Sequence, residues 1–188
     1  MPTDTGALLL PIARAAIARE LGRDYPASED GSWLREPGAT FITLMQSGSL
    51  RGCIGSLRPQ RALLEDVKAN AVAAAFRDPR FSPLRLEEFE TVDIELSLLS
   101  PLEPLLFEDE DHALGQLRPG LDGLVFQYGH HQSTFLPQVW EQFDERREFL
   151  IHLKYKAGLP PDFWDAEVKL ARYTVSKWRE QDLGSNRR

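Results

Sequence analysis

Cysteine, long apolar stretches and basic charge are what this sequence has least of. Its 188 residues contain one cysteine, Cys53, which cannot form a disulfide within the chain and fits a reducing compartment. The longest apolar run near the start, residues 7–10, is closed by Pro11 and is far shorter than the roughly 20 residues that span a bilayer. No basic stretch precedes that run, so a secretion signal is not indicated. We expect a cytoplasmic protein without a membrane segment.

The charge balance and the histidine pattern argue against further classes of function. With 29 acidic and 22 basic side chains the net charge is −7, which would repel the phosphates of a nucleic acid unless the basic residues clustered on one face. The four histidines lack the paired spacing of a metal-binding helix, and no segment matches a glycine-rich phosphate loop. We therefore predict no nucleic-acid partner, no metal site and no cofactor.

Hydrophobic periodicity predicts both helices and strands. Apolar residues recur every three or four positions in residues 5–21, 60–77 and 144–157, which is typical of helices with one buried face. Asp144 is the expected N-cap of the third helix. Residues 92–98 alternate apolar with polar side chains and predict a strand, and residues 39–45 and 50–57 predict a β-hairpin.

The chain is expected to divide into two halves at a proline-rich, acidic linker over residues 101–111. Beyond it, residues 123–128 and 133–136 are expected to pair as strands, and residues 167–175 to close the fold as another strand. The tail from Gln181 has nothing to bury, so we expect it to be disordered.

The segment LRGCIG at residues 50–55 is the strongest candidate for a functional site. Side chains alternate along a strand, so Arg51 and Cys53 are expected to share a face. The guanidinium would then favour the thiolate and lower the pKa of Cys53. The alternative is a buried, inert thiol, since unpaired cysteines are among the most buried residues. A dyad of Cys53 with a histidine also stays open.

Gly52 and Gly55 flank the thiol and allow two interpretations. Glycine occurs in strands where a ligand or another backbone approaches closely. The pair therefore indicates either an approach route for a ligand or tight packing of the strand against the alanine-rich helix that follows.

Two further motifs combine polar groups with a restricted backbone. Residues 78–83, DPRFSP, form a rigid loop that could present charges to a ligand or could contain an internal Asp78–Arg80 ion pair. Residues 135–140, FLPQVW, lie at a strand-to-helix junction whose free amides could hold an anion. Core packing around a helix that starts at proline is the favoured interpretation of this second motif.

Together with LSLLSPLEPL at residues 96–105, the motifs LRGCIG, AFRDPRFSPL at 75–84 and FLPQVW resemble the AMMECR domain family over roughly residues 8–178. The resemblance implies an α+β fold of two sub-domains, with antiparallel sheet, packed helices and a cleft between them. The larger sub-domain would comprise about residues 5–105 with the C-terminal strand 167–178, and the smaller about residues 106–166.

The resemblance also implies a site, because the family's shared residues contribute to its cleft. The matching residues of this sequence are Arg51, Gly52, Cys53, Gly55, Asp78, Arg80, Phe81, Pro137 and Gln138. A fold does not supply a reaction, so the family alone leaves enzymatic activity open.

Two functions follow as hypotheses. Prokaryotic members of the family are often labelled AmmeMemoRadiSam system protein A, which implies a Memo-like protein and a radical SAM protein as partners. We favour an accessory or small-molecule-binding component, because no set of acid, base and nucleophile is recognisable. The alternative is a thiol enzyme in which Cys53 is the nucleophile, Arg51 stabilises the thiolate and Asp78 or Arg80 orients the substrate.

Overall fold

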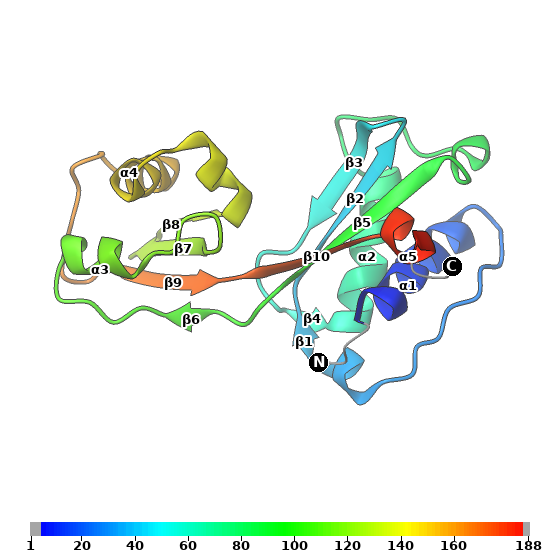
Figure 1. Cartoon of the computed structure of the whole chain (residues 1–188), viewed down its shortest axis with the longest axis horizontal. Coiled ribbons are helices and arrows are strands. Elements are labelled where there is room, and N and C mark those ends of the chain that lie inside the picture. Colours follow the sequence, from blue (N-terminus) through cyan, green and yellow to red (C-terminus); the bar gives the residue numbers. More distant parts are fainter. Residues whose placement is uncertain (1–4, 186–188) are drawn as a thin grey trace. The chain divides into compact units, whose positions relative to one another are not determined.

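The computed structural model describes residues 5–185 and divides the chain into two compact units. The described part of the first unit comprises residues 5–99 and 176–185, and the second unit is Ser100–Val175. Both units combine helices with antiparallel strands, so the expected α+β class is confirmed (Figure 1).

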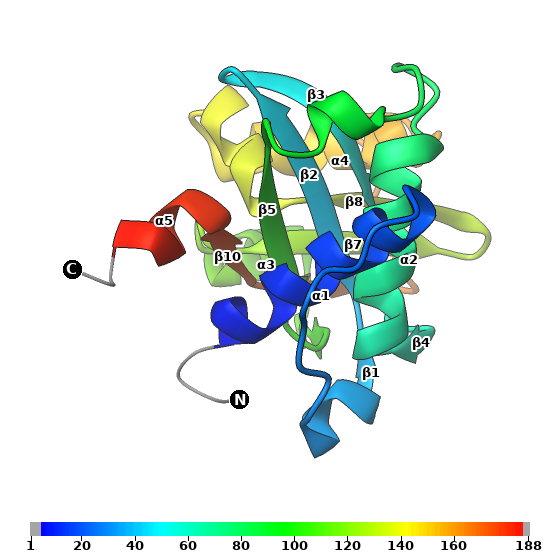
Figure 2. The ribbon, with the colours of Figure 1, turned by 90° about the vertical axis from the view of Figure 1, so that its right-hand side faces the viewer.

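The first unit is a four-stranded sheet with two helices packed on one face. Its elements are α1 Thr5–Glu20, η1 Ser32–Arg35, β1 Pro37–Gly38, β2 Thr40–Gln46, β3 Ser49–Gly55, β4 Arg61–Ala62, α2 Leu63–Phe76, η2 Leu86–Glu88, β5 Val92–Leu99, β10 Val175–Arg179 and α5 Glu180–Ser185. The sheet has the order β10-β5-β2-β3, and α1 and α2 pack against each other in front of it in Figure 2. The core lies between these layers, where Ile42, Leu44 and Ile94 are fully buried.

Strands β2 and β3 form the hairpin that the sequence predicts. Ser47 and Gly48 have φ values of 50° and 78°, as in a type I′ turn, whose twist suits a hairpin. The register then shifts, because Leu44 pairs with Gly52 whereas Met45 pairs with Leu50. Arg51 is therefore the extra residue of a β-bulge, which interrupts the alternation of side chains expected along this strand.

A buried arginine joins α1 to the C-terminal segment. Arg14 donates to both carboxylate oxygens of Glu180 at 2.5 Å and to the backbone carbonyls of Phe89 and Val92 at 2.9 and 2.7 Å. Glu180 also accepts the backbone N–H of Ile94 at 2.8 Å. The start of α5 is thereby fixed to α1 and β5.

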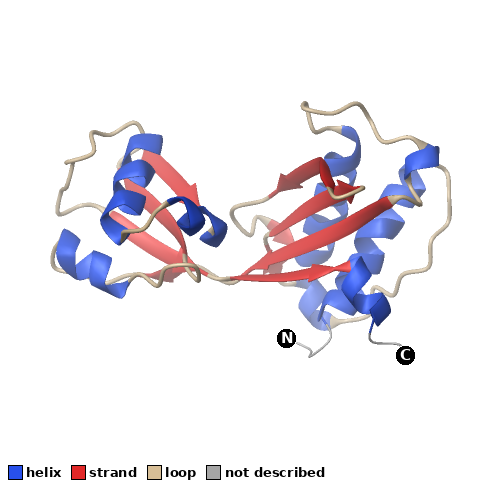
Figure 3. Cartoon of the chain, turned by 45° about the horizontal axis from the view of Figure 1, so that its top comes forward, coloured by secondary structure: helices blue, strands red, loops and turns tan. Residues whose placement is uncertain are grey.

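The second unit has its own four-stranded sheet and its own core. Its elements are β6 Glu103–Pro104, α3 Glu110–Gln116, β7 Gly123–Tyr128, β8 His131–Phe135, η3 Pro137–Gln142, α4 Arg146–Lys156 and β9 Lys169–Tyr173 (Figure 3). The strand order is β6-β9-β7-β8. Trp140 stacks on Phe149 in this core, with parallel rings whose centroids lie 3.7 Å apart.

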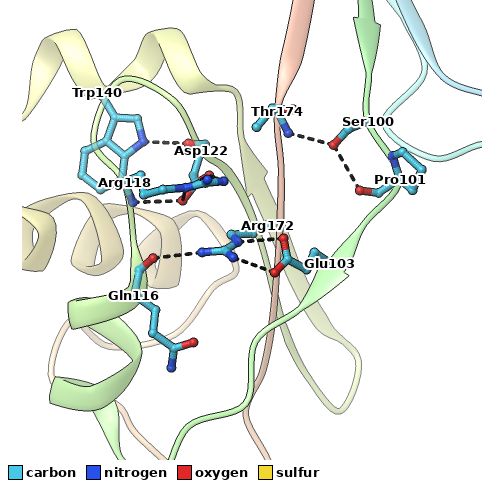
Figure 4. Close-up of polar contacts among 9 residues, drawn as sticks. All are labelled: Ser100, Pro101, Glu103, Gln116, Arg118, Asp122, Trp140, Arg172 and Thr174. Carbon is cyan, nitrogen blue, oxygen red and sulfur yellow. Dashed lines mark hydrogen bonds and ion pairs between the residues drawn. The ribbon is translucent and has the colours of Figure 1, made fainter. Parts of the chain in front are cut away.

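Two polar links, one from β9 and one from the residue that follows it, hold this end of the unit to the chain that enters it (Figure 4). Arg172 donates to both carboxylate oxygens of Glu103, at 3.0 and 2.6 Å. Ser100 and Thr174 are linked twice, because Ser100 N–H donates to the Thr174 carbonyl and Thr174 N–H donates to Ser100 Oγ, both at 2.9 Å. The first and last residues of the second unit therefore lie next to each other.

Several expected boundaries differ from the observed ones. The strand expected over residues 167–178 is two strands in different units, because β9 pairs with β6 and β7 whereas β10 lies beside β5. Helix α4 has Glu145 rather than Asp144 at its N-cap, without a capping hydrogen bond from the side chain. Residues 181–185 of the expected disordered tail belong to α5, and the rest of that tail lies outside the described residues.

Candidate functional site

Cys53 lies in the middle of β3, on the sheet face turned away from α1 and α2. Its neighbours Gly52 and Ile54 face α2 and the core, so alternation along the strand turns the thiol to the opposite face. The side chain is half-buried, and Thr43, directly opposite on β2, donates its hydroxyl to Sγ at 3.3 Å. The thiol is thus a hydrogen-bonded group outside the core between sheet and helices.

Polar side chains continue from the thiol across the whole sheet. Thr43 pairs with Glu95 of β5, whose side chain is 9% exposed. Glu95 in turn forms ion pairs with Lys177 and, at 2.8 Å, with Arg179 of β10. We call these five residues, one thiol, one hydroxyl, one carboxylate and two cations, the polar row.

Asp78 and Arg80 cap the free edge of β3 at Cys53. The strand is the last in its sheet, so its outward backbone groups have no strand partner. Asp78 Oδ2 accepts the N–H of Cys53 at 2.9 Å, and Arg80 Nη2 donates to the Cys53 carbonyl at 3.3 Å. Arg80 also binds both carboxylate oxygens of Asp78, at 3.0 and 2.7 Å. The internal ion pair considered from the sequence is therefore present and closes the strand edge.

The same pair sets the electrostatics beside the thiol. Hydrogen bonds from Arg80 hold the pKa of Asp78 far below its usual range, against the opposing effect of burial. The hydrogen bond to Asp78 in turn raises the pKa of Arg80. Arg80 is thus a cation held at the backbone carbonyl of Cys53.

Arg51, which we expected beside the thiol, is directed elsewhere. Its guanidinium donates to Glu88 at 2.8 and 3.1 Å and to the Ser82 carbonyl at 3.0 Å, and these bonds lower the pKa of Glu88. Only 11% of the Arg51 side chain is exposed. The hydrogen bonds and ion pairs of the described residues include none between Arg51 and Cys53. Two causes account for this: the bulge breaks the alternation of the strand, and Glu88 offers a partly buried carboxylate.

The two glycines of the motif serve close packing. A Cβ atom on Gly52 would lie 2.2 Å from the backbone carbonyl oxygen of Ala74 in α2, so only glycine lets this helix approach the strand. A Cβ atom on Gly55 would lie 2.3 Å from the ring of Phe41 on the neighbouring strand. Of the two interpretations considered from the sequence, packing against the alanine-rich helix describes Gly52.

Phe81 completes the part of the site that belongs to the first unit. Its half-buried ring lies under the guanidinium of Arg80, with 5.5 Å between the guanidinium carbon and the ring centroid. This cation–π contact adds to the Asp78 ion pair in fixing the arginine.

Pro137 and Gln138 belong to the second unit, where they begin η3. Trp140 anchors this turn, because its indole N–H donates to the Asp122 carbonyl at 2.7 Å. The Asp122 carboxylate is fully buried and bound by Arg118, at 2.6 Å for the shortest contact (Figure 4). Pro137 is half-buried and Gln138 exposed. The favoured interpretation of this motif, core packing around a proline start, describes what is found.

Five residues of the site were missed from the sequence: Thr43, Glu95, Lys177 and Arg179 of the polar row, and Glu88, the partner of Arg51. Counting outward from Ser47-Gly48 places Thr43 opposite Gly52, and the bulge at Arg51 moves it opposite Cys53. Glu88 lies 37 positions from Arg51 and carries no local signal of this contact.

No metal centre is visible in the part of the chain that the structure describes, since no three His, Cys, Asp or Glu side chains are grouped to hold an ion. Within the same residues, no helix is long and apolar enough to cross a membrane.

Comparison with known proteins places the chain in a family. A family model described as AMMECR1 matches residues 10–178, which is most of the chain. The chain belongs to the AMMECR1 family. The resemblance of the four motifs is thereby confirmed.

Archaeal members of the AMMECR1 family match nearly the whole chain. A protein of Methanothermobacter thermautotrophicus is 37% identical and is covered over 95% of its length, against 94% of this chain. A protein of Aeropyrum pernix is 38% identical, with 94% of this chain and 79% of that protein covered. The crystal structure of an uncharacterised protein from Pyrococcus horikoshii matches with a TM-score of 0.74 at 34% identity, covering 92% of this chain and 90% of that one.

Proposed function

We propose that this AMMECR1-family chain is a binding or accessory component whose recognition site is centred on Cys53. One observation carries the proposal: the charged groups around the thiol are already engaged in fixed pairs. Asp78 binds Arg80, Glu95 binds two cations of β10, and Arg51 binds Glu88. Groups held in this way present a fixed pattern of charge and hydrogen bonds, which is what recognition needs.

The same contacts argue against turnover at the thiol. A nucleophilic thiol is activated by a base within hydrogen-bond reach or by a cation that lowers its pKa. Among the described residues, the side-chain hydrogen bond to Cys53 comes from Thr43, a hydroxyl that does not act as a base at neutral pH. The Cys53–histidine dyad considered from the sequence has no counterpart among these contacts.

As partners we propose a Memo-like protein and a radical SAM protein, as the family label implies, with a small molecule as a further ligand. The test is titration of the full chain with a Memo-like protein from the same organism at micromolar concentration, with and without a small-molecule extract. Thr43→Val and Cys53→Ser change the polar row with little change in volume, so each should weaken the complex about tenfold, which corresponds to about 1.4 kcal/mol.

Arg58→Ala is the matched control, because Arg58 is exposed and lies outside the polar row. It should leave the affinity unchanged. If the chain formed no complex under any of these conditions, or if Arg58→Ala weakened binding as much as the site variants, the proposal would be refuted.

A thiol enzyme is the second candidate, favoured by the guanidinium of Arg80, which donates to the Cys53 carbonyl at 3.3 Å and so places a positive charge near the thiol. We would then expect native Cys53 to react with iodoacetamide faster at pH 7 than a free cysteine, whose pKa is about 8.5. Alkylation that occurs only after denaturation, or at the rate of free cysteine, would exclude this candidate.

A further inference from the structure

A cavity lies in the first unit, between α1, α2 and the loop of residues 21–31. Its volume is about 480 Å³, within the range of roughly 300 to 1,000 Å³ that small-ligand pockets occupy. The loop runs back along the outer side of the two helices, in front of them in Figure 2. Helix α2 separates this cavity from β3 and Cys53.

Short apolar side chains form the floor of the cavity. The two helices contribute residues with small or branched side chains, and the loop contributes one more alanine: Ile12, Ala15, Ala16, Ala69, Val72 and Ala27. Because these side chains are short, space remains between the helices where larger residues would fill it.

The loop over the cavity is held at both ends by ion pairs. Lys68 of α2 binds Glu29 at 2.8 Å, and Arg23 binds Glu90, also at 2.8 Å. Tyr25 packs edge-on against Phe89 with ring centroids 6.4 Å apart. The cavity is therefore bounded by a tethered segment.

The rim carries charges of both signs that have no partner within the described chain. Arg19 and Arg77 are exposed at the ends of α1 and α2, and neither forms an ion pair or side-chain hydrogen bond among the described residues. The same holds for three carboxylates of the rim, those of Glu20, Asp24 and Glu65. A simple anion would meet these three negative charges, and a simple cation would meet the two guanidinium groups.

We propose that the cavity binds a small zwitterion with an apolar body, of the size of a dipeptide. The ligand's carboxylate would bind Arg19 or Arg77, its ammonium group would bind Glu20 or Glu65, and its apolar part would cover the alanine floor. Both charges and the apolar body of such a ligand are complementary to groups that line the same cavity.

The test is titration of the full-length ¹⁵N-labelled protein with the dipeptide leucyl-leucine. We expect a Kd of about 1 mM or tighter, with chemical-shift changes at the amides of Ala15, Ala16 and Ala69. Three derivatives separate the charges: N-acetyl-leucyl-leucine lacks the ammonium group, leucyl-leucinamide lacks the carboxylate, and N-acetyl-leucyl-leucinamide lacks both. Each derivative that lacks one charge should bind up to about fivefold more weakly than leucyl-leucine, and the derivative that lacks both should bind most weakly, since exposed ion pairs contribute modestly.

Variants connect binding to the cavity. Arg77→Ala and Arg19→Ala remove exposed side chains without described contacts, so the fold is kept, and together they should weaken leucyl-leucine about fivefold. Ala69→Phe should fill the cavity and abolish the shifts, while Arg35→Ala, exposed and outside the lining, should change nothing.

The proposal is overturned if leucyl-leucine causes no shift at the cavity, or if the uncharged derivative binds as well as the zwitterion. It is also overturned if Arg35→Ala weakens binding as much as the two cavity variants. None of these readouts involves Cys53, so the result is independent of the function proposed for the polar row.

Discussion

Gly52 and Asp78 fix the position of Cys53 from two sides. Gly52 lets the backbone of α2 approach the strand, and Asp78 holds the N–H of Cys53 at the strand edge. Neither residue needs to contact a ligand for this role. Their importance for any function of the thiol is that they hold the backbone on which it sits.

Gly52→Ala should destabilise the first unit by about 1–3 kcal/mol, because the added Cβ would overlap the carbonyl oxygen of Ala74. Gly115→Ala is the contrasting change, since Gly115 is exposed in α3 with open space around it. Removing a glycine from a helix should stabilise the second unit by about 0.5–1 kcal/mol. Native-state hydrogen exchange measures the stability of each unit separately. If Gly52→Ala and Gly115→Ala changed the stability of their units in the same direction, this account would be contradicted.

Asp78→Asn should cost about 1–3 kcal/mol at pH 7, because the amide keeps an acceptor for Cys53 but loses the charge that binds Arg80. The folded state lowers the pKa of Asp78 below the unfolded value of about 3.9. The ionised carboxylate therefore stabilises the fold above that pH, and this contribution is lost as the pH falls further. Thermal denaturation from pH 7 to pH 3 should show the difference from wild type shrinking below about pH 4. A constant difference would contradict the pair's role.

For single residues, the sequence predicts contacts between positions close together in the chain but not contacts between distant positions. The Asp78–Arg80 pair spans two positions in a proline-restricted loop, so it could be considered in advance. The contact of Arg51 with Glu88 could not be considered in advance, because the direction of the Arg51 side chain depends on a bulge that hairpin spacing does not reveal.

Three carboxylates lie on or next to β5, an inner strand of the sheet in the first unit. Asp93 and Glu95 lie on this strand, and Glu180 follows directly after β10. Arg14, Lys177 and Arg179 neutralise Glu180 and Glu95. Among the described residues, the hydrogen bond to the Asp93 carboxylate comes from a backbone N–H, that of Gln181 at 3.2 Å.

Asp93→Asn should therefore raise the melting temperature at pH 7. Burial, followed by the charge of Glu180, raises the pKa of Asp93 in the folded state. A raised pKa means that the ionised form costs stability above the folded pKa, and that wild type regains this stability as the pH falls. Asparagine removes the charge and keeps an acceptor for Gln181. In paired melting curves the gain should vanish by about pH 4, where the unfolded carboxyl also begins to take up its proton. A gain in melting temperature that persists at pH 3 would show that the stabilisation by Asp93→Asn does not come from removing the charge.

Element types follow from periodicity, whereas their ends depend on tertiary contacts. The three main helices and the central strand form where their apolar patterns predict. Helix α2 begins only at Leu63, because residues 61–62 pair with β1. The strand expected over residues 167–178 divides near Thr174, because its two parts pair in different sheets.

The second unit is one continuous segment, whereas the first is assembled from both ends of the chain. A proline-rich linker indicated two halves from the sequence. The place of division was less visible, because it follows from the pairing of Ser100 with Thr174 rather than from composition. The cleft implied by the family resemblance stays a prediction.

A fragment of residues 100–175 should fold alone, because its core residues all come from within it. Its ¹H–¹⁵N spectrum should be dispersed and should overlay that of the intact protein. A fragment of residues 1–175 should keep that dispersed set but lose protection in the first unit, since β10 and Glu180 are missing. A collapsed, undispersed spectrum for residues 100–175 would contradict the independence of its core.

The two hydrogen bonds between Ser100 and Thr174 also mark the place where the second unit is inserted into the chain of the first. Strands β5 and β10 are neighbours in the sheet, and the whole second unit connects the end of β5 to the start of β10. The chain leaves and returns at the adjacent residues Ser100 and Thr174, so the second unit is equivalent to the loop of a hairpin. A loop whose ends are pinned together can change in length or content without altering the register of the strands below it. The first unit is thus a scaffold on which this insert, or a different one, could be exchanged while Cys53 and its polar row keep their places.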